Sequence, residues 1–123
     1  MKIVLRSVVF ALALLGLLFP FMGVMALLFL VPMVVRYRLA VWWARHVIMP
    51  AVRLTAGIGC RVEGRENLPA EPCVILSKHQ SAWETLFFLA HMPRQVCFVY
   101  KKELHYVPFF GWGLALLRMI PIN

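Results

Sequence analysis

The sequence predicts an α/β protein in which hydrophobic membrane helices come first and a layered α/β unit follows. Hydrophobic residues make up 63% of the chain and charged residues 15%, whereas soluble domains average about 45–50% and about 25%. The apolar excess is concentrated in residues 7–35, which contain no charged side chain. After Gly57 and Gly59 the pattern changes to short apolar runs that alternate with helical stretches. We therefore expect a membrane-embedded or interfacial part at residues 1–57 and a second part at residues 58–123.

The uncharged run is long enough to cross a bilayer, which takes about 20 apolar residues in a helix. Lys2 and Arg6 precede it, as in a secretory signal, but the run stays apolar beyond the small residue Ala26, where such a signal would be cut. We therefore interpret it as a retained membrane segment. Pro20 interrupts the run and Pro32 ends it. Both a single tilted span and a helix that enters one leaflet and turns back agree with this pattern.

Residues 36–55 predict a second helix with a basic stripe. On a helical wheel its cationic side chains fall within about 100° of one another; they are Arg38, Arg45, His46 and Arg53. Apolar residues surround the stripe, which favours a helix lying in the membrane interface over an ordinary amphipathic helix packed on a core. If the preceding run spans the membrane, the excess of Arg after it places the C-terminal part on the cytoplasmic side.

The elements expected in residues 58–123 alternate between strand and helix. Strands are predicted at residues 58–62, 73–76, 96–100 and 120–122, and helices at residues 82–91 and 108–117. The run at 73–76 is apolar and bounded by turn signals, as in a buried strand. Strands separated by helices favour an α/β layer with parallel pairing.

The net charge of +8, from 13 Lys and Arg against five acidic residues, is also typical of nucleic-acid binding. We expect no nucleic-acid partner, because so apolar a chain would aggregate in water, whereas basic residues beside an apolar segment suit an anionic membrane surface. The cysteines, Cys60, Cys73 and Cys97, are widely spaced and odd in number. They therefore indicate neither a disulfide framework nor a metal site.

A polar stretch that includes His79 lies between the strand expected at 73–76 and the helix expected at 82–91. Side chains at the C-terminal end of a strand in an α/β sheet face the usual ligand crevice, and His is well suited to move a proton near neutral pH. A carboxylate can fix the His tautomer and stabilise the imidazolium. Glu84 follows in the first turn of the expected helix, so a turn between the two residues lets their side chains converge.

Glu84 also has a structural interpretation. Residues 81–84 fit the S-x-x-E pattern of a capping box, in which Ser81 caps the helix and Glu84 bonds back to the Ser81 backbone. Spacing alone favours this role. The two roles are compatible, because one carboxylate has two oxygens.

This stretch resembles the glycerophospholipid acyltransferase family that includes the 1-acyl-sn-glycerol-3-phosphate acyltransferases. The first motif of that family is His, four residues, then Asp, and residues 79–84 match it with Glu in the acid position. Residues 62–69 are similar to the segment that precedes the motif, and residues 101–104 and 107–113 are similar to the approach to the second motif. The resemblance covers residues 58–123 and implies an α/β acyltransferase domain there.

The chain departs from the family pattern in two ways. It contains no Asp, so Glu84 replaces the usual acid with one extra methylene. The second motif of the family ends with an Arg just beyond the position of Asn123, and a third motif similar to Glu-Gly-Thr-Arg lies further on. We therefore expect residues 58–123 to be the first half of the domain, truncated at the C-terminus.

The resemblance implies acyl transfer from acyl-CoA or acyl-carrier protein, as a co-substrate, to the free hydroxyl of lysophosphatidate in phosphatidate and phospholipid synthesis. His79 would act as general base and Glu84 would orient it, while Lys101 and Lys102 would bind the substrate phosphate. The alternative for each lysine is a solvated basic loop. The resemblance implies no cofactor and no metal.

The implied location is the membrane, with the active site on the cytoplasmic side, which is the inner membrane if the protein is bacterial. The alternative to an enzyme is a non-enzymatic membrane anchor, or a fragment that binds anionic lipid.

Overall fold

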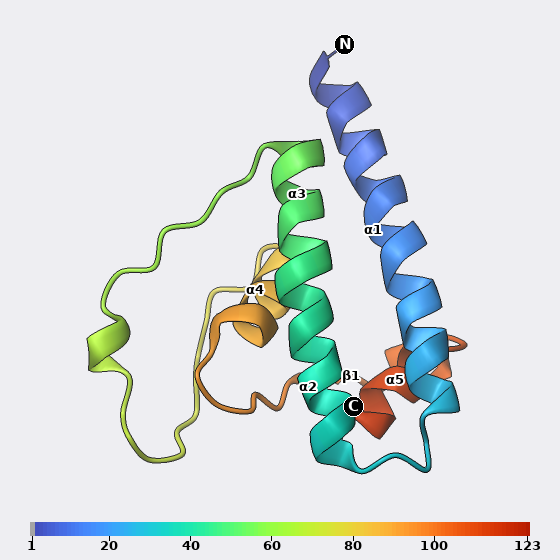
Figure 1. The fold of residues 1–123 in the computed structure, drawn as a ribbon, viewed down its shortest axis with the longest axis vertical. Coiled ribbons are helices and arrows are strands. Elements are labelled where there is room, and N and C mark those ends of the chain that lie inside the picture. The colour runs from blue at the N-terminus through green and yellow to red at the C-terminus, as the bar shows by residue number, and fades with distance from the viewer. Residues whose placement is uncertain (1) are drawn as a thin grey trace.

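The computed structural model describes residues 2–123, and these residues are mostly helical. The first helix, α1 (Lys2–Leu27), runs through Pro20 without a break. After a short turn, α2 (Met33–Trp43), the π-helical η1 (Ala44–Ile48) and α3 (Met49–Ala56) follow one another as a nearly continuous rod. Figure 1 shows this rod beside α1 and running in the opposite direction, and α3 packs on α1. The two predicted N-terminal helices therefore form a hairpin.

Two residues with special backbones shape the second rod. Pro50 lacks an N–H, and its ring would crowd the carbonyl four residues back in a regular α-helix. The wide turn of η1 lies directly before it. Gly57 ends α3 in the left-handed conformation, with φ at 71°, which glycine adopts without the steric cost that a Cβ would bring.

Most of the apolar surface of α1 is exposed. Residues Ile3–Leu27 are long and apolar enough to cross a membrane, and side chains such as Val8 and Leu12 in the N-terminal half face away from the rest of the protein. In the C-terminal half Met22 and Met25 are buried, and α5 packs on this helix. The structure therefore agrees with the prediction of one helix able to span a membrane.

The helix α4 (Ala82–His91) lies at the residues predicted for it and packs on α2 and η1. Its buried residues, Leu86, Leu89 and Ala90, belong to one apolar cluster with Trp43 and Ala44 of the second rod. Because the apolar face of α4 is covered by the hairpin, the position of α4 is set by the hairpin.

The helix α5 (Phe110–Leu116) packs on both α1 and the 3₁₀-helix η3 (Lys102–Tyr106). Two glycines permit this close approach. A Cβ on Gly111 would lie 2.1 Å from the carbonyl oxygen of His105, and a Cβ on Gly113 would lie 2.4 Å from the Met22 sulfur. The helix predicted at residues 108–117 is thus confirmed in a shorter form.

The strands β1 (Val99–Lys101) and β2 (Ile120–Ile122) pair in parallel, with Tyr100 opposite Pro121. η3 and α5 connect them, which is the helical crossover that parallel pairing requires. The strand predicted at 120–122 is confirmed. The strand predicted at 96–100 is shifted toward the C-terminus, because the Val96 N–H donates to the Tyr37 hydroxyl at 2.7 Å and is not available to a sheet.

The strands predicted at residues 58–62 and 73–76 are wrong. Both lie in a long irregular segment between α3 and α4 that contains the 3₁₀-helix η2 (Arg65–Asn67) and loops away from the hairpin (Figure 1). Val74 and Leu76 are 88% and 94% exposed, so the apolar run is not a buried strand. A strand needs a neighbour for its N–H and C=O groups, and the two strands within residues 2–123 pair with each other.

Candidate active site

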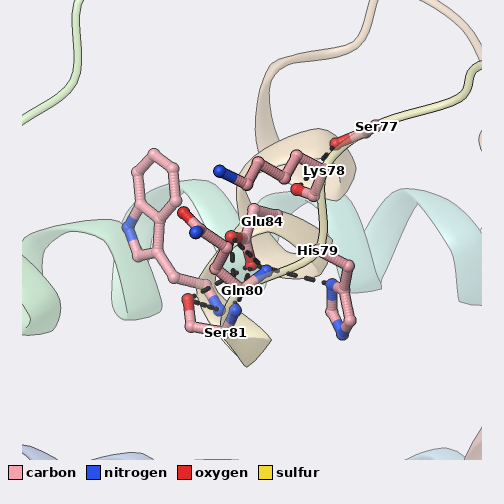
Figure 2. A network of polar contacts seen from close by, with 7 residues as sticks. Ser77, Lys78, His79, Gln80, Ser81 and Glu84 are labelled. Carbon is pink, nitrogen blue, oxygen red and sulfur yellow. Dashed lines mark hydrogen bonds and ion pairs between the residues drawn. The ribbon is translucent and has the colours of Figure 1, made fainter.

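The start of α4 is held by a capping box, as the S-x-x-E pattern predicts. Ser81 is the N-cap, and its Oγ accepts a hydrogen bond from the Trp83 N–H at 3.2 Å. In return Glu84 Oε2 accepts from the Ser81 N–H at 2.9 Å, and Oε1 accepts from the Gln80 N–H at 3.0 Å. Figure 2 shows these bonds converging on one carboxylate, which is therefore fixed in place by the backbone around it.

The same bonds keep the Glu84 carboxylate charged. Partial desolvation favours the neutral acid, but hydrogen bonds from the backbone amides of Gln80, Glu84 and Ser81 and from the Ser81 hydroxyl outweigh it. The pKa of the Glu84 carboxyl therefore lies below its ordinary value of 4.5, as expected when donors stabilise the charged form. At neutral pH the start of α4 carries a fixed negative charge.

His79 lies beside this charge. Its Nδ1 is 3.7 Å from Glu84 Oε2, and the side chains of the two residues are 69% and 20% exposed. The distance exceeds that of a hydrogen bond, which is about 2.7–3.2 Å for nitrogen and oxygen, but it is within ion-pair range. The predicted convergence of His79 and Glu84 is confirmed, and the capping role does not prevent it, because Oε2 serves both (Figure 2).

The imidazole is open to solvent and to a ligand. Two hollows lie between α1 and α3, lined mainly by apolar residues such as Phe10 and by Arg6 at the N-terminal end, and neither includes His79. Within residues 2–123 no cluster of three His, Cys, Asp or Glu side chains could hold a metal ion. The exposed imidazole of His79 beside the fixed Glu84 carboxylate is an arrangement that can transfer a proton.

Lys101 and Lys102 occupy a different place in the fold. Lys101 is the last residue of β1 and Lys102 the first of η3, and both are exposed. Within residues 2–123 no hydrogen bond or ion pair links either lysine to His79 or Glu84. The lysines are therefore not bonded to the pair of His79 and Glu84, and both remain candidates for phosphate binding.

Two arginines that the sequence did not single out for the site hold the other end of α4. Arg45 of η1 donates to the Ala90 carbonyl oxygen through Nε at 3.0 Å and Nη2 at 2.7 Å. Arg65 of η2 donates through Nη2 to the His91 carbonyl oxygen at 2.8 Å. Basic side chains can bond the last carbonyls of a helix, but here they come from distant segments, so spacing along the chain gives no signal for them.

Comparisons with known proteins agree with the motif. Residues 59–123 match the family model described as Acyltransferase. The chain is 53% identical over 95 residues to a 1-acyl-sn-glycerol-3-phosphate acyltransferase of Pseudomonas aeruginosa, an alignment that covers 76% of this chain and 36% of the relative. It is 35% identical over 112 residues to the protein of the same name from Saccharomyces cerevisiae. That alignment covers 91% of this chain and 36% of the relative.

The chain spans about a third of the length of the curated relatives it matches. No solved structure gave a significant match. Because the family model covers more than half of the chain and includes both His79 and Glu84, the chain belongs to the acyltransferase family.

Proposed function

We propose that this protein transfers a fatty acyl group from a thioester to the free hydroxyl of lysophosphatidate, which yields phosphatidate. The relatives that share most of this chain are named for that activity. The observation that carries the proposal is the 3.7 Å approach of His79 Nδ1 to the Glu84 carboxylate in a position open to a ligand. The donor would be acyl-CoA or acyl-carrier protein, as a co-substrate, and the reaction would use no resident cofactor or metal.

His79 would act as the general base. The imidazole takes the proton of the acceptor hydroxyl while that oxygen attacks the thioester carbonyl, and a carbon–oxygen bond forms. When the tetrahedral intermediate collapses, the carbon–sulfur bond breaks and the leaving thiolate takes the proton from the imidazolium. Positioned acid–base catalysis of this kind contributes about 10²–10⁴ in rate.

Glu84 would stabilise the imidazolium as it forms. Its carboxylate is held by the Gln80 and Ser81 amides, so the negative charge does not have to be reoriented when His79 becomes positive. A preorganised charge of this kind is more effective than a mobile one. The extra methylene of Glu relative to Asp is accommodated because the capping box folds the side chain back over the start of α4.

Lys101 and Lys102 would attract the phosphate of the acceptor. Both amines are exposed, and a flexible ammonium group binds phosphate as a point charge. This role requires the phosphate end of the substrate to lie toward the β1–η3 junction while the hydroxyl lies at His79.

Residues 1–57 would hold the site at the membrane, and residues 58–123 would form the first half of an α/β acyltransferase domain on the cytoplasmic side. The exposed apolar surface of α1 and the basic side chains Arg38 and Arg53 on the second rod support this arrangement. An interfacial location suits a reaction in which both the acceptor and the product are lipids.

An assay with defined substrates tests the proposal. The 123-residue chain, and its reading frame extended to the length of the relatives, are purified in detergent and placed in vesicles with lysophosphatidate and a labelled acyl thioester. We expect labelled phosphatidate from one or both proteins. Vesicle binding without phosphatidate from either protein would contradict the enzymatic function and favour a membrane anchor.

A further inference from the structure

We propose that Arg45 is a positioning residue for the reaction. From the helical hairpin, it fixes the C-terminal end of α4 and so determines where α4 presents His79 and Glu84 relative to the membrane helices. This inference rests on the proposed function, which supplies the reaction that the position serves.

The contact is a two-pronged hydrogen bond from a charged group to a single buried acceptor. Arg45 Nε and Nη2 both donate to the Ala90 carbonyl oxygen, at 3.0 and 2.7 Å, and Ala90 has no exposed surface. Ala90 lies in the last turn of α4, where carbonyls have no partner within the helix and the helix dipole is negative. A planar guanidinium holds such an acceptor in a fixed direction, which a lysine does not do.

Arg45 occupies a suitable place on the hairpin. It lies in η1, and its neighbours Ala44 and Ile48 in the same wide turn are fully buried. α4 packs on this turn. A π-helical turn changes the direction of its side chains relative to a continuous α-helix, and such turns are frequent at functional sites. The bond therefore joins the active-site helix to the hairpin where the two are in contact.

Within residues 2–123, no hydrogen bond or ion pair joins the N-terminal end of α4 to the hairpin. The capping box ties Ser81 to Glu84, the Gln80 N–H donates to the same carboxylate, and His79 lies within ion-pair range of it, but the residues before this local unit are irregular and exposed. The pair of His79 and Glu84 therefore moves with α4 as one body. What fixes this body against the membrane helices is the buried face of α4 and the bond from Arg45.

The stripe of basic residues on the second rod thus has two roles. Arg53 and Arg45 are both exposed on this rod, but within residues 2–123 no hydrogen bond or ion pair is found for the side chain of Arg53. It remains suited to a lipid headgroup. Arg45 instead faces α4, although the same helical wheel places it in the stripe.

The test compares Arg45→Met, Arg45→Lys and the matched control Arg53→Met in whichever length of the protein is active. We expect Arg45→Met to lower kcat per folded molecule by about tenfold or more, since small misplacements of a reacting group have effects of this size. The kcat of Arg45→Lys should lie between those of Arg45→Met and the wild type, and Arg53→Met should keep the wild-type kcat. The KM for the acyl thioester should stay near the wild-type value in all three variants, because the local unit is intact.

Hydrogen exchange on the 123-residue chain in detergent gives a readout that does not need activity. Arg45→Met should increase exchange in α4 while α1 and α5 keep their wild-type protection. The positioning role is wrong if Arg45→Met and Arg53→Met have equal kcat per folded molecule, or if exchange rises equally in all helices. An inactive wild type at both lengths would instead contradict the proposed function, and exchange in α4 would still decide whether the bond holds the helix.

Discussion

Nδ1 of His79 lies 3.7 Å from Oε2 of Glu84, and the same oxygen accepts a hydrogen bond from the Ser81 amide at 2.9 Å. One carboxylate therefore caps α4 and faces the imidazole at the same time. The cap does not compete with the proposed chemistry. It fixes the carboxylate and keeps it ionised, which a general base needs from its neighbour.

The first prediction concerns stability at acidic pH. The pKa of the Glu84 carboxyl is lowered below 4.5 in the folded protein, so the stabilisation from its ionised form is fully present above pH 4.5 and is lost as the pH falls through the folded-state pKa. In Glu84→Gln this part of the pH dependence should be absent. Thermal unfolding in detergent between about pH 6 and about pH 3 measures the difference.

Glu66→Gln is the control for this experiment, because Glu66 is an exposed acid on η2. The thermal stability of Glu66→Gln should depend on pH in the same way as that of the wild type. If Glu84→Gln loses as much stability on acidification as the wild type does, the hydrogen bonds of the cap do not stabilise the charged form of Glu84.

The second prediction separates the charge of Glu84 from its shape. Glu84→Gln keeps the length of the side chain and an oxygen for the cap, but it removes the charge that would stabilise the imidazolium. We expect kcat to fall by about 10² or more, since removing the analogous charge in a His–acid pair has effects up to about 10⁴. Glu84→Asp keeps the charge and should retain more activity than Glu84→Gln. Equal activity of Glu84→Gln and the wild type would show that the carboxylate acts only as a cap.

The third prediction concerns the packing of α5. Gly111→Ala places a Cβ 2.1 Å from the His105 carbonyl oxygen, which is backbone and must shift, so we expect a loss of about 1–3 kcal/mol in the free energy of unfolding. Gly113→Ala should cost less, because its Cβ meets the flexible side chain of Met22. Gly16→Ala is the control, since nothing lies within 4 Å of its added Cβ. Similar stabilities for Gly111→Ala and Gly16→Ala in denaturant titrations would contradict this packing.

The fourth prediction concerns the phosphate of the acceptor. If Lys101 or Lys102 binds it, the variants Lys101→Met and Lys102→Met should raise the KM for lysophosphatidate and leave kcat near the wild-type value, because the lost contact is the same in the ground and transition states. Lys78→Met, which removes an exposed amine next to His79, is the comparison. An unchanged KM in both variants would leave the two lysines as a solvated loop.

The parts of the fold that local chemistry decides were predictable from the sequence. α4 spans Ala82–His91 as predicted, and its start is fixed because Ser81 and Glu84 provide a cap whose partners are all within the same turn. The convergence of Glu84 on His79 follows from the same short-range bonds. The parallel pairing of β1 with β2 was also predictable, since a helix separates two β-prone runs.

The failures have a common physical origin. The run at residues 73–76 has the composition of a buried strand, but burial depends on a neighbouring strand, and composition does not show whether one is present. The hydrogen bonds of Arg45 to Ala90 and of Arg65 to His91 have backbone acceptors from distant segments. Every residue has a backbone carbonyl that can accept such a bond. The residue type therefore does not indicate which carbonyl an arginine will bind.

The most direct test of the central claim is the rate of acyl transfer by His79→Ala, measured under saturating lysophosphatidate and acyl thioester in the length of the protein that is active. His46→Ala is the control, because His46 is an exposed histidine on η1 whose ring stacks on Trp42. We predict that His79→Ala lowers kcat by about 10²–10⁴ while vesicle binding and the folded fraction stay at wild-type levels. A kcat for His79→Ala within a fewfold of the wild type and of His46→Ala would contradict the assignment of His79 as the general base.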